Sequence, residues 1–169
     1  MNTSEVLTDA FGRIHEAVHD AVDGLTPDGL HDRLDPGANS IAWLVWHLGR
    51  IQDDHVADAA GREQVWLADG WSERFGLPFD TNETGYGQTS SQVAQVRVGS
   101  AEMLLGYFDA VHTRTLEYVG GLNGPALNRV VDESWAPPVT LGVRLVSVIA
   151  DSLQHAGQAA FIRGALVRR

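Results

Sequence analysis

Apolar residues recur at spacings of three and four along four segments of the chain, which is the period of one face of an α-helix. The pattern predicts helices over residues 3–23, about 40–60, about 90–119 and about 140–167. The second of these opens with IAWLVWHLGRI, which is apolar on nearly all sides and is typical of a buried helix. In the first segment the recurring apolar positions are Val6, Leu7, Phe11, Ile14, Val18 and Val22.

Capping residues indicate where the first two helices begin and end. The Thr3–Ser4 pair supplies a hydroxyl cap for the first helix, and Gly24 is a plausible end, since glycine accepts the left-handed conformation found there. The Asn39–Ser40 pair caps the second helix in the same way, and Gly61 ends it.

The third helix is expected to begin at Thr89 or Ser90 and to run to about Val119, with Gly99 as a place where it can break or kink. The last helix is expected to begin near Thr140. The apolar positions that mark the inner stripe of the third helix are Val93, Val96, Ala101, Leu104, Leu105, Phe108, Val111, Thr115 and Tyr118.

The segments between these helices carry turn and loop signals. Residues 25–39 contain two Asp/Pro/Gly clusters and are interpreted as turns. Residues 61–88 mix aromatic residues with Gly, Pro and Asn, and we expect a long ordered loop with room for one helical turn; its role stays open. RVVDESW is a weak strand candidate. The sequence therefore predicts an all-α protein, a four-helix bundle with long crossover loops, in a single domain over residues 1–169.

Two polar residues follow the apolar run LGVRLVSVIA on the last helix. Asp151 and His155 are four positions apart and so share one helix face, about 5–6 Å apart at Cβ. His47 lies in an equally apolar stretch of the second helix. A charge buried without a partner costs several kcal/mol, so these residues are expected to meet. From the residues alone, a metal site and a buried Asp–His ion pair are equally good interpretations.

Further residues share the faces of this cluster. Trp43 and Asp54 lie near the His47 face; Trp43 is interpreted as core or pocket wall, and Asp54 as either a solvated acid or an acceptor that holds a ligand imidazole. Gln158 lies near the other face, where it could orient a metal-bound water or tie two helices together. Arg163 could bind a substrate carboxylate or complement the helix dipole. Trp135 is equally compatible with a lid and with an interface.

The remaining histidines receive less specific interpretations. His55 could share the face of His47 but is interpreted as a surface residue. His15 and His19 have the spacing of a ligand pair, yet their surroundings, RIHEAVHDAVD, are mixed and charged. We therefore interpret that pair as part of a solvated face.

Composition excludes several function classes. A formal net charge of -10 opposes binding to nucleic acid. With no cysteine, the chain has no disulfide, no thiolate nucleophile and no cysteine metal site, and this fits a reducing compartment. All 12 basic residues are arginine, which removes mechanisms based on lysine. We see neither a secretory signal nor a membrane span, and expect a cytoplasmic protein.

The segments NSIAWLVWHLGRIQDDHV and DSLQHAGQAAFIRG resemble the DinB-like superfamily of four-helix proteins, and the resemblance covers most of the chain. This group includes mycothiol- and bacillithiol-dependent S-transferases and mycothiol-dependent maleylpyruvate isomerases. The resemblance implies that His47, Asp151 and His155 bind a divalent metal. The first residue of the pair on the last helix is often His in this group, and the isomerase branch resembles a His/Glu/His version, so Asp151 is a departure.

The resemblance also implies a function. We expect a metal-dependent enzyme that uses Zn²⁺ or Ni²⁺ and a low-molecular-weight thiol such as mycothiol, for S-transfer or isomerisation of a small-molecule substrate. Since the chain has no cysteine, the thiol must arrive with the cosubstrate. The alternative is a non-catalytic stress-related or binding protein with a structural or vestigial metal site. Homodimerisation through helix faces is expected by analogy with related proteins.

Overall fold

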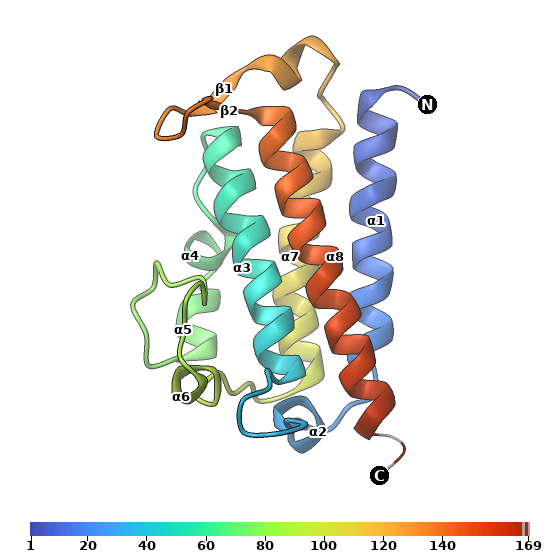
Figure 1. The fold of residues 1–169 in the computed structure, drawn as a ribbon, viewed down its shortest axis with the longest axis vertical. Coiled ribbons are helices and arrows are strands. Elements are labelled where there is room, and N and C mark those ends of the chain that lie inside the picture. The colour runs from blue at the N-terminus through green and yellow to red at the C-terminus, as the bar shows by residue number, and fades with distance from the viewer. Residues whose placement is uncertain (167, 169) are drawn as a thin grey trace.

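The computed structural model describes residues 1–166 and 168, and within them four long helices pack side by side (Figure 1). Neighbouring helices contact one another in the cyclic order α1, α8, α3, α7, so the α1/α7 edge of the bundle lies opposite the α3/α8 edge. This confirms the predicted all-α four-helix bundle. The four helices are α1 (Thr3–Val22), α3 (Ile41–Ala60), α7 (Ala101–Val119) and α8 (Leu141–Leu166).

Short elements connect the long helices. A small antiparallel hairpin, which includes the weak strand candidate of the sequence, lies at one end of the bundle (Figure 1). Two short helices lie within residues 61–88, where one turn was expected, and another interrupts the turns of residues 25–39. These elements are α2 (Pro27–His31), α4 (Val65–Ala68), α5 (Trp71–Phe75), α6 (Ser90–Val93), the 3₁₀ helix η1 (Pro125–Asn128), β1 (Val130–Asp132) and β2 (Val139–Thr140).

The helix ends follow capping chemistry, with one correction. Ser40 caps α3 by accepting a hydrogen bond from the Trp43 backbone N–H, and Gly61 ends it at φ 64°. At the start of α1, however, the cap is Asn2 rather than Thr3 or Ser4. Asn2 and Glu5 form a reciprocal capping box, which satisfies two free N–H groups instead of one.

The expected continuous third helix is wrong, because residues 94–100 are not helical. Helix α6 ends at Val93, and α7 begins only after the cap Ser100, whose Oγ accepts from the Met103 N–H. In between, the Val98 N–H donates to Nε2 of His31 at 2.9 Å. A hydrogen bond to a distant side chain and a strong local cap together outweigh the helical period of the sequence.

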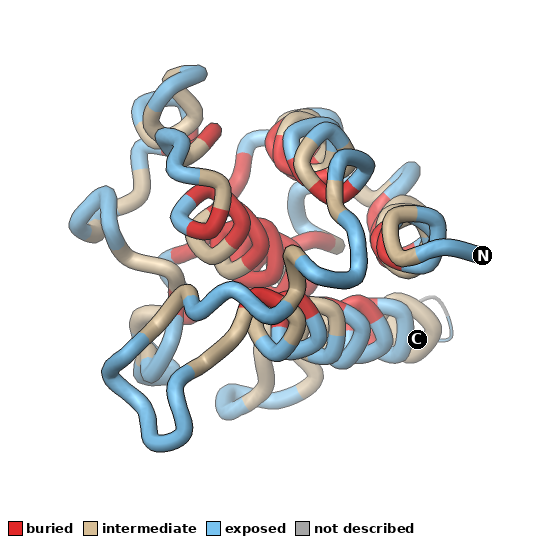
Figure 2. The backbone as a smooth tube through the Cα atoms, turned by 90° about the horizontal axis from the view of Figure 1, so that it is seen from above, coloured by how far each residue is buried: buried red, intermediate tan, exposed pale blue. Residues whose placement is uncertain are grey.

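The core lies where the four long helices meet, and Figure 2 shows the buried segments turned towards the middle of the bundle. Helix α3 is buried on most of its surface, as its apolar start predicts. Helix α8 is not buried all round, and a stripe of exposed apolar side chains covers its outer face. The apolar run LGVRLVSVIA had suggested a helix buried on all sides, and the structure corrects this expectation. The expected end of the helix near Val167 lies outside the described residues. The large exposed side chains of that stripe are Val143, Val146, Leu153 and Phe161.

None of the described helices combines the length and the apolar character needed to cross a bilayer.

Candidate metal centre

Three side chains from α3 and α8 converge at the α3/α8 edge of the bundle. His47, Asp151 and His155 each offer a ligand atom, and these atoms all lie within 4.8 Å of one another. The His155 Nε2 is 3.5 Å from Oδ1 of Asp151, and the rings of His47 and His155 are 4.9 Å apart at an angle of 76°. The residues expected from spacing to meet are therefore brought together.

His47 is held in one tautomer by the loop before α6. Its Nδ1–H donates to the backbone carbonyl of Thr84, because a carbonyl oxygen can only accept. Burial lowers the pKa of His47, although the hydrogen bond to Thr84 acts in the opposite direction. A neutral ring fixed in this way presents the lone pair of Nε2, as a metal-ligating histidine requires.

His155 is oriented by its own helix. Its Nδ1 lies 3.0 Å from Oε1 of Gln158, one turn further along α8. An amide oxygen accepts, so this contact places the proton on Nδ1 and leaves Nε2 for the side of Asp151. The hydrogen bond with Asp151 raises the pKa of His155, and burial opposes this shift.

Asp151 has one carboxylate oxygen that lacks a hydrogen-bond partner among the described residues. This atom, Oδ2, is buried. Partial burial by itself would raise the pKa of Asp151, but the contact with His155 and the charges of the neighbouring histidines together lower it. An ionised carboxylate with a buried, unpaired oxygen beside two imidazole nitrogens fits a divalent cation.

Trp43 forms the wall of this cluster. Its ring stacks on His47 with centroids 4.6 Å apart and planes inclined by 12°, and it meets His155 edge-on at 6.1 Å. Its Nε1–H donates to Oε1 of Gln88 at 2.8 Å, which fixes the indole. Stacking of this kind limits the rotamers of His47 and keeps water from one side of the ring.

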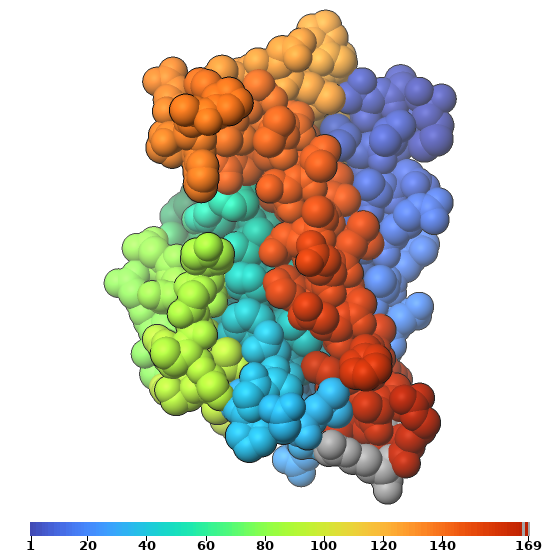
Figure 3. Space-filling model, viewed as in Figure 1, coloured from blue at the N-terminus to red at the C-terminus, as the bar shows by residue number. Residues whose placement is uncertain are grey.

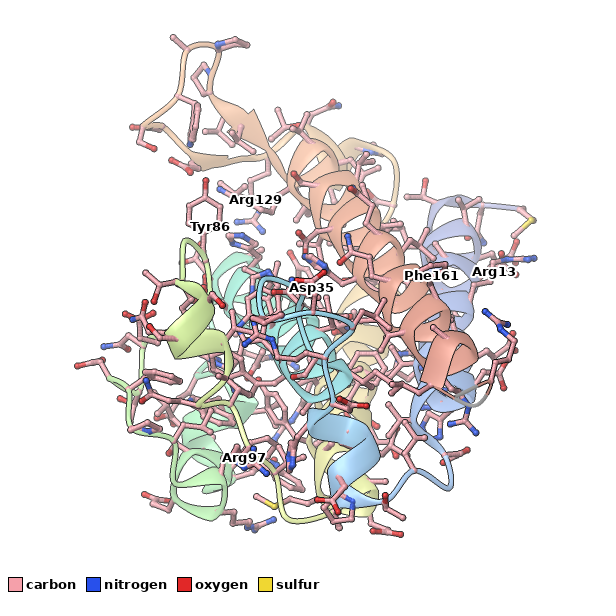
Figure 4. The ribbon with its side chains drawn as sticks, turned by 60° about the horizontal axis from the view of Figure 1, so that its bottom comes forward. Arg13, Asp35, Tyr86, Arg97, Arg129 and Phe161 are labelled. Carbon is pink, nitrogen blue, oxygen red and sulfur yellow. The ribbon has the colours of Figure 1, made fainter. Side chains whose placement is uncertain are left out.

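The loop of residues 80–88 packs directly against the back of His47, and in Figure 3 this yellow-green segment lies beside α3. Gly85 has φ +91°, and a Cβ there would lie 2.9 Å from His47 Nδ1 and 2.9 Å from Cζ3 of Trp46. Only glycine satisfies both the backbone conformation and the close approach. Tyr86, by contrast, extends away from the loop (Figure 4) and is exposed.

Arg50, one turn after His47, holds the loop and was not singled out from the sequence. Its fully buried guanidinium donates to the carbonyl of Glu83 at 3.1 Å, to that of Thr81 at 3.4 Å and to Oε1 of Gln64 at 2.7 Å. It also lies over the ring of Trp66, 5.0 Å from the centroid. The one available signal was an arginine inside the apolar run WLVWHLGRI.

The other candidate residues make contacts elsewhere. Asp54 accepts a hydrogen bond from Gln64 at 2.8 Å. The group that accepts the hydrogen bond from His47 is the Thr84 carbonyl and not Asp54. Arg163 donates to the Ala21 carbonyl in the last turn of α1 at 3.3 Å, so its charge lies at the C-terminal end of α1 rather than of its own helix. Trp135 is exposed between β1 and β2.

A cavity of about 580 Å³ lies between residues 34–39, α3 and α8. It reaches Gln158, the residue that orients His155, and Phe161, whose position on α8 can be followed in Figure 4. A smaller cavity of about 270 Å³ lies beside Asp53. Neither cavity is lined by the three converging residues, but the larger one reaches Gln158, which contacts His155.

Comparisons with known proteins identify the fold and the family. The chain is similar over its whole length to a crystal structure described as that of the conserved protein of a locus from Enterococcus faecalis, with a TM-score of 0.91 and 29% sequence identity over 100% of this chain and 99% of that chain. No curated protein matches the chain. The family model described as mycothiol-S-transferase matches residues 6–167. A DinB-like bundle that gathers two histidines and an aspartate, together with this match, shows that the chain belongs to the mycothiol S-transferase family.

Proposed function

We propose that His47, Asp151 and His155 bind one divalent metal, and that the protein is a metal-dependent enzyme that acts on a low-molecular-weight thiol such as mycothiol. The observation that carries the proposal is the pairing of a neutral, carbonyl-anchored His47 with the unpartnered buried Oδ2 of Asp151. Two imidazole nitrogens and one carboxylate leave a fourth position open on the ion, as catalytic sites do.

A divalent ion at this position would lower the pKa of a coordinating thiol and so provide a thiolate nucleophile. In S-transfer, the sulfur forms a bond to an electrophilic carbon, the bond to the leaving group breaks, and the thiol proton passes to solvent. In isomerisation the thiol adds to the substrate and is later released. The chain itself has no cysteine, so the sulfur belongs to the cosubstrate.

The residues around the site position and shield it. Thr84 and Gln158 keep the Nε2 atoms of His47 and His155 directed at one point, and Trp43 covers the face of His47. A cavity of about 580 Å³ reaches Gln158, which contacts His155, and it is the space proposed for a cosubstrate. Orientation of reacting groups by a rigid wall and fixed ligands is the main contribution of this chain.

Three finer expectations are part of the proposal. Zn²⁺ or Ni²⁺ is the metal, because two imidazoles and a carboxylate suit both ions. The protein forms a homodimer, for which the exposed apolar stripe of α8 supplies a surface. The cytoplasmic location expected from the sequence stays a prediction.

The test is metal analysis and thiol consumption with untagged protein. Asp151→Asn and His155→Gln remove the anionic and imidazole ligands with little change of volume, and we expect each to weaken metal binding by more than roughly 100-fold, beyond the loss typical of outer-sphere changes. Thiol consumption in a mycothiol–electrophile assay should fall with the metal. Asp54→Asn, an acid on α3 that binds Gln64 instead, is the matched control and should keep both.

Two outcomes would contradict the proposal in different ways. Metal content unchanged in Asp151→Asn and His155→Gln would overturn the site. Full metal occupancy without thiol consumption, over a range of electrophiles, would favour the non-catalytic alternative.

A further inference from the structure

A second histidine cluster lies on the opposite edge of the bundle, between α1 and α7. His15 and His19 of α1, four residues apart, both face Asp109 of α7. Their side chains are partly buried, with 31% and 28% of their surfaces exposed, so the solvated face expected from the sequence is wrong. Mixed charges around the pair suggested solvent, and the packing of α1 against α7 instead places a carboxylate in front of both rings.

The donor atoms of this cluster are close to metal-ligand geometry. The Nε2 atoms of His15 and His19 are each 2.8 Å from the same Oδ1 of Asp109, and the three ligand atoms lie within 4.8 Å of one another. Ligand atoms around a tetrahedral ion with bonds of about 2.05 Å are about 3.3 Å apart. A ligand shift of roughly 0.5 Å would therefore open the cluster around an ion, within the freedom of three partly exposed side chains.

A third imidazole, that of His112, packs against the cluster. The His112 ring stacks on that of His15 with centroids 4.4 Å apart, and its Nδ1 is buried with no hydrogen-bond partner among the described residues. A buried imidazole nitrogen without a hydrogen-bond partner, next to a group of converging ligand atoms, indicates that the hydrogen-bond network is incomplete and that a further group binds here.

An outer carboxylate also fits the pattern of a metal site. Asp23, at the end of α1, places Oδ2 3.6 Å from Nδ1 of His19, the nitrogen that faces away from Asp109. Metal-ligating histidines commonly direct their second nitrogen to a carboxylate in this manner. A plain hydrogen-bonded link between two helices needs only one histidine, whereas two imidazole nitrogens that converge on one carboxylate provide the donor set of a divalent transition metal.

We propose that His15, His19 and Asp109 form a second divalent transition-metal site, which links α1 to α7 and is independent of the site between α3 and α8. Nitrogen-rich coordination with one carboxylate selects ions such as Zn²⁺, Co²⁺ or Cu²⁺ over Mg²⁺ and Ca²⁺. Since the ligands come from two helices, binding stabilises the folded bundle in addition to any effect on chemistry.

The experiment is titration of chelator-stripped, untagged protein with Zn²⁺, and with Co²⁺ as a spectroscopic probe. His15→Gln with His19→Gln keeps amide donors towards Asp109 and removes both imidazoles, while Asp151→Asn with His155→Gln disables the other site. His31→Gln is the matched control, because His31 accepts the Val98 N–H outside both clusters. Circular dichroism of each variant verifies that it is folded.

We expect two equivalents of Zn²⁺ in the wild-type protein and in His31→Gln, one equivalent in each double variant, and none in the quadruple variant. In the Asp151→Asn/His155→Gln protein, Zn²⁺ at roughly 100 times its Kd should raise Tm by about 5–10 °C. That rise should disappear when His15→Gln and His19→Gln are added.

The two proposals fail separately. A single equivalent that is lost only with Asp151→Asn/His155→Gln would overturn the α1–α7 site and leave the proposed function intact. A single equivalent lost only with His15→Gln/His19→Gln would support the α1–α7 site and overturn the metal centre of the proposed function.

Discussion

At the residue scale, the state of His47 depends on a backbone group far away in the sequence. The Thr84 carbonyl accepts a hydrogen bond from Nδ1–H of His47, and burial keeps the ring neutral. Gly85 allows the loop to approach the His47 ring within van der Waals distance. The sequence indicated His47 through its apolar surroundings but gave no sign of Thr84 or Gly85, because a backbone acceptor has no side-chain signature.

Gly85→Ala tests this packing. The new Cβ would overlap His47 and Trp46, so we expect a loss of about 2–4 kcal/mol in the free energy of unfolding, from backbone strain and overpacking together. The affinity for Zn²⁺ should fall as well. Urea denaturation with a chelator present, followed by zinc titration, measures both.

Gly87→Ala is the matched control for that substitution. Gly87 also has a positive φ, +73°, but a Cβ there would meet nothing within 4 Å, so only the backbone strain of about 1–2 kcal/mol applies. Equal losses for the two variants, with unchanged zinc affinity, would refute the role assigned to the close contact at Gly85.

At the element scale, Arg50 joins α3 to the loop that supports His47. It binds two loop carbonyls and Gln64, and its guanidinium also lies 3.8 Å from Oδ2 of Asp53. Asp53 in turn accepts from the Val65 and Trp66 N–H groups at the start of α4, and burial raises its pKa. The long segment after α3 is thus fixed by two buried polar side chains of that helix.

Arg50→Met removes this link while keeping much of the volume. Three acceptors would lose this donor and the buried Asp53 its neighbouring positive charge, so we expect destabilisation by about 3–5 kcal/mol, and faster amide exchange in residues 81–88. Arg62→Met, which removes an exposed ion pair with Glu117, should cost less than about 1 kcal/mol. Similar stability and exchange in both variants would show that Arg50 does not hold the loop.

The interrupted third helix shows where prediction of elements from the sequence stops. The stripe from Val93 to Tyr118 was expected to face the core: its members as far as Thr115, including Val96, are buried, and Tyr118 is partly buried against the core. The spacing of apolar residues could not reveal that the Val98 N–H donates a hydrogen bond to His31, since the two residues are 67 positions apart in the sequence. Hydrophobic pattern reports burial, and a buried extended segment can carry the same pattern as a buried helix.

At the scale of the whole molecule, the outer face of α8 is the surface on which exposed large apolar side chains gather. Its apolar stripe follows the helical period and lies beside the face that carries Asp151 and His155. Exposed apolar stripes of this kind mark association surfaces more often than chance. The proposed homodimer would cover it with the same face of a second copy.

Val146→Glu combined with Leu153→Glu should convert such a dimer into a monomer, because two carboxylates would be buried against their copies. Light scattering at matched concentrations measures the mass in solution. Val6→Glu introduces the same charge at an exposed position of α1 and should leave the mass unchanged. A wild-type protein that is already monomeric at high concentration would refute the dimer.

The sequence by itself determined the presence of four long helices and the approximate bounds of α1, α3 and α8, together with the Ser40 and Gly61 ends of α3 and the shared face of Asp151 and His155, because period and capping act within a few residues. Only the tertiary structure decided that His47 meets that pair, that Thr84 and Arg50 support it, and that His15 and His19 face Asp109, 94 and 90 positions away. These contacts depend on which helices become neighbours, and packing of the whole chain sets that choice.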